Sequence, residues 1–155
     1  MNSDKLNTWL AVLANIGVLA GVVFLAMEIR QNTSTVQIGN FQGSLALSMQ
    51  LESWMLDSEF ANLWYQGLSD HSQLTGPQKM QFDSYFGQSL NVWEFAFNAH
   101  QSEAMSDVTW NSWNDYYSSW IRQDTLSDLW KTSKRVDYSG AGGFLLYIDS
   151  VVQNE

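Results

Sequence analysis

The sequence predicts an all-α protein in which one N-terminal transmembrane helix is followed by a small antiparallel helical bundle. The first observation is an uncharged, apolar segment from Leu10 to Met27. The second is the spacing of apolar and aromatic residues beyond it, which recur every three or four positions as in amphipathic helices and do not alternate as in strands. The third is the presence of only 1 proline in the chain, which favours long helices. We therefore expect a transmembrane anchor over residues 1–30 and a helical bundle domain over residues 31–155.

The apolar segment has the length of a membrane span. As a helix rising about 1.5 Å per residue, Trp9 to Met27 covers roughly 28 Å, close to the ~30 Å of a bilayer's hydrocarbon core. Trp9 suits one membrane interface, and the polar residues from Glu28 onward suit the other. Two alternatives are less favoured. A signal peptide would need a more basic N-terminus and an A-x-A cleavage site, and a buried core helix rarely has so long an uncharged run.

The charges that flank this segment leave its orientation open. Lys5 and the α-amine precede the segment, whereas Arg30 follows it. By the positive-inside rule, this count favours a cytoplasmic N-terminus with the helical domain on the opposite side. The margin is a single charge and a short N-terminal tail crosses a membrane easily, so both orientations stay open.

Small residues form one face of the predicted span. Ala14, Gly17 and Gly21 lie at helical spacing, and the two glycines form a G-x-x-x-G pair that allows close approach of a second membrane helix. Asn15 lies beside this face, and an amide in hydrocarbon needs a hydrogen-bond partner. We therefore predict that the span contacts a second copy, giving a homo-oligomer, or contacts a larger membrane protein complex. The alternative is a small oligomeric channel or transport component with Asn15 near the pore.

The first helix is expected to continue past the span to about Leu56. Gly39 and Gly43 weaken this stretch and predict a break or kink there. Phe41, Leu45 and Met49 step by four and form an apolar face.

Helix-start signals divide the next part of the domain. Asp57 is a good N-cap for a second helix, and residues 69–73 are interpreted as a loop. Thr75, with Pro77 in the first turn, begins a long helix that ends near Glu103. The apolar stripe of this long helix consists of Phe82, Phe86, Leu90, Trp93 and Phe97.

A tryptophan stripe marks the following helix, which Ser106 or Asp107 caps. Trp110, Trp113 and Trp120 share one side of it, which favours packing within the bundle and leaves a protein-facing contact as the alternative. The chain then has a short helix starting at Thr125 or Ser127, a basic, glycine-containing connection over residues 131–143, and a final helix containing Phe144, Leu145, Ile148 and Val152.

Several short motifs occur in a familiar order. They are an IRQNT exit at residues 29–33, a D-x-E-x-x-x-L-W element from Asp57 to Trp64, an aromatic patch around Glu94, W-x-x-W at Trp110 and Trp113, and Ile148–Asp149 after Tyr147. In this order the chain resembles, over nearly its whole length, a family of small bacterial single-pass membrane proteins with no assigned activity. The resemblance implies the anchor-and-bundle architecture and a bacterial inner membrane. Such proteins often have more basic residues after the span, which would imply a cytoplasmic domain, whereas here only Arg30 remains.

Motifs for chemistry are scarce. The sequence has no P-loop, dinucleotide-binding, zinc-protease or nucleophile-elbow motif, and it contains no cysteine. His71 and His100 each lack a Glu three positions earlier, as a carboxylate-bridged metal pair would require. The glycine-rich residues 140–143 follow no predicted strand and are interpreted as a flexible turn. We therefore expect no catalytic residue, no cofactor and no bound metal.

Glu94 is the acidic residue that the pattern places among aromatic neighbours. Gly87, Asn91 and Asn98 lie on the same side of its helix and form a polar strip. One interpretation is a partly buried carboxylate with a raised pKa, usable in proton chemistry. The favoured interpretation is a solvated or amide-bonded carboxylate that pairs with Arg122.

The charge of the chain limits its partners. A net charge of -9, from 16 acidic and 7 basic residues, repels phosphate backbones, so nucleic acid is not an expected partner. We therefore predict a non-enzymatic single-pass membrane protein that acts as an oligomerising scaffold or as an accessory subunit of a membrane complex, with the lipid bilayer as its environment. A membrane-anchored enzyme built around Glu94 or His100 is a further alternative.

Overall fold

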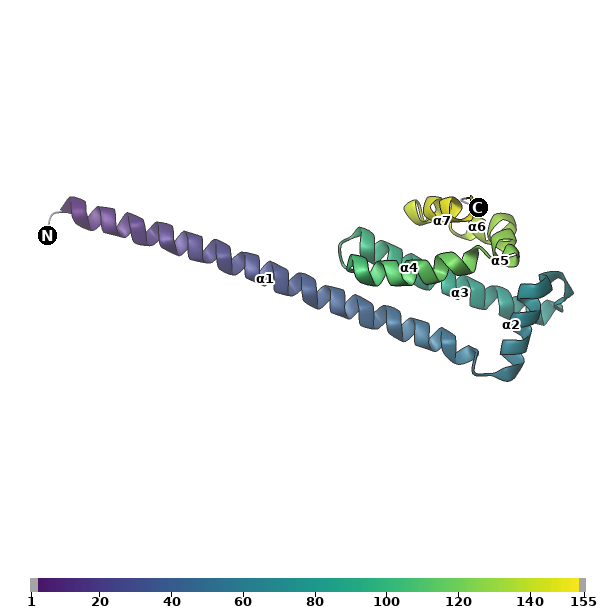
Figure 1. Cartoon of the computed structure of the whole chain (residues 1–155). Helices are drawn as coiled ribbons and strands as arrows, with labels where there is room; N and C mark the ends of the chain where they lie inside the picture. Colours follow the sequence, from purple (N-terminus) through teal and green to yellow (C-terminus); the bar gives the residue numbers. More distant parts are fainter. Residues whose placement is uncertain (1–2, 154–155) are drawn as a thin grey trace. The chain divides into compact units, whose positions relative to one another are not determined.

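The computed structural model describes residues 3–153 and is all-α, as predicted, with no strand among these residues. Figure 1 shows the helices in chain order. They are α1 (Ser3–Trp54), α2 (Ser58–Asp70), the 3₁₀ turn η1 (His71–Gln73), α3 (Gly76–Gln101), α4 (Asp107–Ile121), α5 (Asp124–Leu129), the π-helical turn η2 (Trp130–Lys134), α6 (Arg135–Asp137) and α7 (Gly143–Gln153).

The chain divides into two compact units, Met1–Ile38 and Gly39–Glu155. Helix α1 continues from the first unit into the second without interruption, and both Gly39 and Gly43 are α-helical. The prediction of a helix break near these glycines is therefore wrong. A helical glycine costs only about 1 kcal/mol relative to alanine, which is small against the cooperativity of a long helix.

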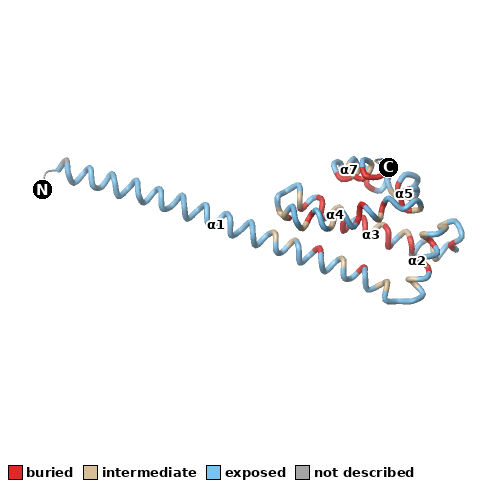
Figure 2. The backbone as a smooth tube through the Cα atoms, in the orientation of Figure 1, coloured by how far each residue is buried: buried red, intermediate tan, exposed pale blue. Residues whose placement is uncertain are grey.

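The first unit consists of the N-terminal part of α1. No residue in the most apolar stretch of this helix is buried by the rest of the chain. Figure 2 shows this part of α1 as a pale blue, exposed tube. Among residues 3–153, α1 is the helix long and apolar enough to cross a membrane.

In the second unit, α1 buries a face that combines polar residues with a leucine. Ser44 is fully buried and Leu51 nearly so, and Asn40 Nδ2 donates a hydrogen bond to the Ala104 carbonyl at 3.1 Å. The predicted apolar face of Phe41, Leu45 and Met49 is instead exposed. The short side chain of Ser44 allows another helix to approach closely. The hydrogen bond from Asn40 joins residues far apart in the sequence, so hydrophobic periodicity could not predict which face is buried.

Three of the predicted helix starts are confirmed, whereas α5 begins at Asp124, ahead of the predicted Thr125 or Ser127. Asp57 accepts hydrogen bonds from the backbone N–H groups of Glu59 and Phe60, and Ser106 caps α4 through Thr109 N–H. Thr75 and Gln78 form a capping box at the start of α3, with Pro77 in the first turn. The predicted loop 69–73 is more regular than expected, because α2 includes Asp70 and a 3₁₀ turn follows.

The core of the second unit is built on α3. Its predicted apolar stripe is confirmed: Phe82, Phe86, Leu90, Trp93 and Phe97 are all buried. Trp64 of α2 stacks on Phe82 with ring centroids 4.2 Å apart, and Phe144 of α7 packs edge-on against Trp93 at 5.6 Å. Helices α2, α4 and α7 therefore cover α3 largely through aromatic rings.

A single amide ties three helices together inside this core. Asn114 Oδ1 on α4 accepts hydrogen bonds from Trp93 Nε1 on α3 at 3.2 Å and from the Tyr147 hydroxyl on α7 at 2.7 Å. The Ser118 hydroxyl lies 3.4 Å from the same oxygen. Buried indole and phenol groups need acceptors, and Asn114 supplies one for both.

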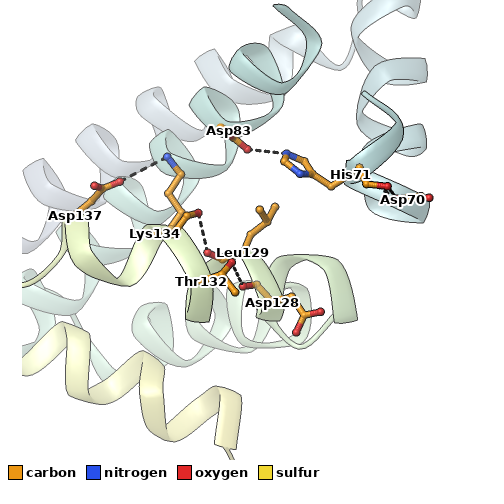
Figure 3. Close-up of polar contacts among 10 residues, drawn as sticks. Asp70, His71, Asp83, Asp128, Leu129, Thr132, Lys134 and Asp137 are labelled. Atoms are coloured by element: carbon orange, nitrogen blue, oxygen red, sulfur yellow. Dashed lines mark hydrogen bonds and ion pairs between the residues drawn. The ribbon is translucent and has the colours of Figure 1, made fainter. Parts of the chain in front are cut away.

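The predicted connection over residues 131–143 is wrong in its first half. Helix α5 begins at Asp124, and the chain then forms the π-helical turn η2 and the short α6 before it leaves helical structure. The Thr132 hydroxyl donates to the Asp128 carbonyl at 2.6 Å, and Lys134 Nζ lies 3.6 Å from Asp137 Oδ2 (Figure 3). Trp130, fully buried, anchors this segment on the core.

Candidate functional site

The face predicted to contact another membrane helix lies open on α1. Ala14, Gly17 and Gly21 are exposed, and a Cβ atom added at either glycine would meet nothing within 4 Å. The packing of the chain itself therefore gives no reason for glycine at these positions, where each costs about 1 kcal/mol relative to alanine.

Asn15 is exposed beside this face. Successive helical residues are about 100° apart around the axis, so Asn15 flanks Ala14 and does not point away from it. Among the described residues, the Asn15 side chain has no hydrogen-bond partner. Its amide is therefore available to a partner outside the chain.

The tryptophan stripe of α4 is occupied by contacts within the bundle. Trp110 is buried and packs against His100 and Phe97 of α3. Trp120 is half-buried against Trp64 at 5.1 Å, and Trp113 is half-buried near Tyr117. Intrachain packing thus accounts for most of the area of the stripe.

Each histidine pairs with a carboxylate. His71 Nε2 lies 3.0 Å from Asp83 Oδ1 (Figure 3), and His100 Nε2 lies 3.0 Å from Asp107 Oδ1. Within residues 3–153, no group of three or more His, Asp or Glu side chains is arranged to hold a metal ion.

A polar cavity of about 380 Å³ lies between α3 and the segment after η2. Gly87, Asn91 and Glu94 of α3, which belong to the polar strip expected from the sequence, line one wall. The opposite wall consists of Asp137, Tyr138, Gly140 and Ala141. The predicted glycine-rich turn therefore contributes to a cavity wall.

Tyr138 holds the two walls together. Its hydroxyl lies 2.6 Å from Asn91 Oδ1 and 3.1 Å from the Gly87 carbonyl oxygen. Its ring packs against the rings of Trp130 and Phe144, with centroids 5.6 and 5.9 Å away. Burial raises the pKa of Tyr138, and the negative charges of Glu94 and Asp137 raise it further, so the hydroxyl keeps its proton.

Glu94 is half-buried in this cavity, and burial raises its pKa above the ordinary value. The expected partner is absent: Arg122 Nε donates to the Val151 carbonyl at 3.4 Å instead. Among the described residues, no hydrogen bond or ion pair reaches the Glu94 carboxylate. His100 does not line the cavity, so the structure does not unite the two residues considered for an enzyme.

Only one wall of this cavity has a signature in the sequence. The recurrence of Gly87, Asn91 and Glu94 at helical spacing identified one wall. Asp137 and Tyr138 were missed because they follow a π-helical turn, which no periodic pattern indicates.

A larger, more open hollow of about 680 Å³ lies where α1, α2 and α3 meet. Trp54, Phe60, Pro77 and Met80 supply most of its apolar lining. Its carboxylate, Asp57, is already engaged as the N-cap of α2. Ser53, Gln81 and Ser84 supply the rest of its polar lining.

Comparisons with protein-family models, with curated proteins and with solved structures give no match to this chain. The resemblance to small bacterial membrane proteins therefore stays a prediction.

Proposed function

We propose that the chain is a non-enzymatic, single-pass membrane protein of the bacterial inner membrane. The N-terminal part of α1 anchors it in the bilayer and pairs with a second copy, and the helical domain serves as a contact surface for a membrane complex. The observation that carries the proposal is an apolar helix whose side chains find no cover within the chain.

The uncovered residues support the anchor. Large apolar side chains such as Leu13, Val18 and Phe24 are each at least 60% exposed, so leaving them in water would be costly. The charged and amide residues that begin with Glu28 mark one end of the apolar length, and Trp9 marks the other. A bilayer supplies the apolar environment that the chain lacks.

The open glycines support pairing within the bilayer. Lipid tails are as apolar as leucine, so membrane helices associate through close packing and interhelical hydrogen bonds. Gly17 and Gly21 permit close packing, and Asn15 supplies a donor and an acceptor on the adjacent side. The same face could also contact another membrane protein. A second copy of the chain carries the same small residues and the same amide, so self-pairing requires no additional protein.

A double variant, Gly17→Ile with Gly21→Ile, tests the pairing. The matched control is Gly39→Ile with Gly43→Ile, because these glycines have the same spacing on α1, lie beyond the predicted span, and also have open space at Cβ. Analytical ultracentrifugation in detergent should show an oligomer for the parent chain and the control, and a monomer for the first variant. An unchanged oligomer in the first variant overturns the pairing.

The anchor is tested separately. The parent chain should stay with bacterial inner membranes after alkaline extraction, whereas Leu19→Arg should release it, because a charge at the centre of a span costs about 3 kcal/mol on insertion scales. Release of the parent chain would contradict the anchor. Reporters fused to the C-terminus would then determine the side on which the helical domain lies.

A further inference from the structure

We propose that the polar cavity between α3 and the segment after η2 binds a small organic cation with a primary ammonium group. The proposal is independent of the membrane anchor, since every lining residue belongs to the helical domain.

The first argument is the balance of charge in the cavity. Two carboxylates line it, and Lys134 compensates one of them, lying 3.6 Å from Asp137 Oδ2. The Lys134 side chain is only 19% exposed, which holds it near that partner. Glu94 remains without a partner among the described residues. The cavity therefore has one uncompensated negative charge, which a monovalent cation would neutralise.

The second argument is the hydrogen-bond character of the wall. The Tyr138 hydroxyl has one proton and lies within reach of two oxygens, Asn91 Oδ1 and the Gly87 carbonyl. If the Asn91 amide turns over, Nδ2 donates to the hydroxyl, the hydroxyl donates to Gly87, and both bonds are satisfied. Asn91 Oδ1 is then left without a donor, and Asn91 lines the same wall of the cavity as Glu94. A primary ammonium group, with three N–H donors, matches these acceptors.

The third argument excludes other ligand classes. Lys134 Nζ lies close to the Gly87 wall, 3.7 Å from where a Cβ atom would stand, but it is paired with Asp137. The cavity with its neighbouring lysine therefore keeps a net negative charge from Glu94, which disfavours an anion. A divalent metal ion is disfavoured because no group of three or more ligating side chains is found in residues 3–153. The polar lining offers little to an uncharged apolar molecule.

The cavity is also held in place before a ligand arrives. Trp130 and Phe144 fix the Tyr138 ring, and both are fully buried. Gly87 and Asn91 belong to the middle of α3, the longest helix of the core. A preformed site loses little entropy when it binds a small ligand.

The test uses the full chain in detergent and n-propylammonium chloride as the probe. Backbone amide signals of Gly140 and Ala141, which lie in the cavity wall, are followed by NMR during the titration. We expect saturable shifts at these residues, none with sodium propionate, and at least tenfold weaker binding with tetramethylammonium, which has no N–H donor.

Glu94→Gln should abolish the shifts, while Glu59→Gln, which removes an equal charge from an exposed site on α2, should leave them unchanged. Tyr138→Phe keeps the ring and should weaken binding severalfold. Equal binding to Glu94→Gln, non-saturable shifts, or equal binding of tetramethylammonium would each overturn the proposal.

Because the headgroup of phosphatidylethanolamine also has a primary ammonium group, nanodiscs of phosphatidylethanolamine and of phosphatidylcholine are compared. Shifts in the former alone identify a lipid source, and shifts that need added amine identify a free one.

Discussion

The indole Nε1 of Trp130 donates a hydrogen bond to Asp149 Oδ1 at 3.0 Å, which joins the π-helical turn η2 to helix α7. Arg135 reinforces the link, because its Nε and Nη2 atoms donate to the same carboxylate at 3.0 and 2.8 Å. Trp130 is fully buried, so its N–H has no access to water as a substitute acceptor. Asp149 is therefore a structural acceptor whose loss affects both segments.

Asp149→Ala should destabilise the helical domain by about 1–3 kcal/mol, since it leaves a buried N–H donor without a partner. Asp149→Asn keeps an acceptor for Trp130 and should cost less. Arg135→Ala should cost less than Asp149→Ala, because its side chain is half exposed and exposed ion pairs contribute little. Chemical denaturation followed by tryptophan fluorescence measures all three. A larger loss for Arg135→Ala than for Asp149→Ala would contradict this ranking.

The same carboxylate makes stability depend on pH. Hydrogen bonds from Arg135 and Trp130 and the charge of Arg135 lower the pKa of Asp149 below its ordinary value of 3.8, although burial opposes them. The unfolded chain therefore takes up the proton first as pH falls, so the contribution to stability is complete above the ordinary pKa and is lost between that value and the lowered one. Unfolding free energies of the parent chain and Asp149→Asn should differ above the ordinary pKa of Asp149 and converge as pH falls below the lowered one. A constant difference would argue against the linkage.

The parts of the fold that the sequence predicted are those that depend on neighbouring residues. Asp57, Thr75 and Ser106 cap helices within four residues of themselves, and the stripe of α3 follows helical spacing. The parts that were missed depend on distant partners. The turn η2 is tied to Asp149, and the buried face of α1 is fixed by a bond from Asn40 to the Ala104 carbonyl. Asp137 and Tyr138 of the polar cavity follow the turn η2, so they were missed with it.

Gly67 of α2 illustrates a close contact with no sequence signature. A Cβ atom there would clash with the Phe82 ring, which is fully buried and stacked on Trp64. Gly67→Ala should therefore cost about 1–3 kcal/mol through overpacking, despite the better helix propensity of alanine. Gly43→Ala, where the added carbon meets nothing within 4 Å, should instead be neutral or stabilising by up to about 1 kcal/mol. Thermal unfolding by circular dichroism compares the two, and equal effects would rule out the clash as the cause.

Asn15 tests whether the proposed helix pair uses a polar contact as well as small residues. Asn15→Leu keeps the span apolar and of similar volume but removes the amide. If the amide bonds across the pair, self-association should weaken by about 1 kcal/mol, close to a fivefold change in the dissociation constant. The matched control is Asn32→Leu, because Asn32 is exposed beyond the apolar segment, where water can solvate its amide. Sedimentation equilibrium in detergent measures both variants.

Equal association constants for the parent chain and Asn15→Leu would mean that pairing depends on Gly17 and Gly21 and not on the amide. Weakening in the Asn32 control would instead place the contact outside the span.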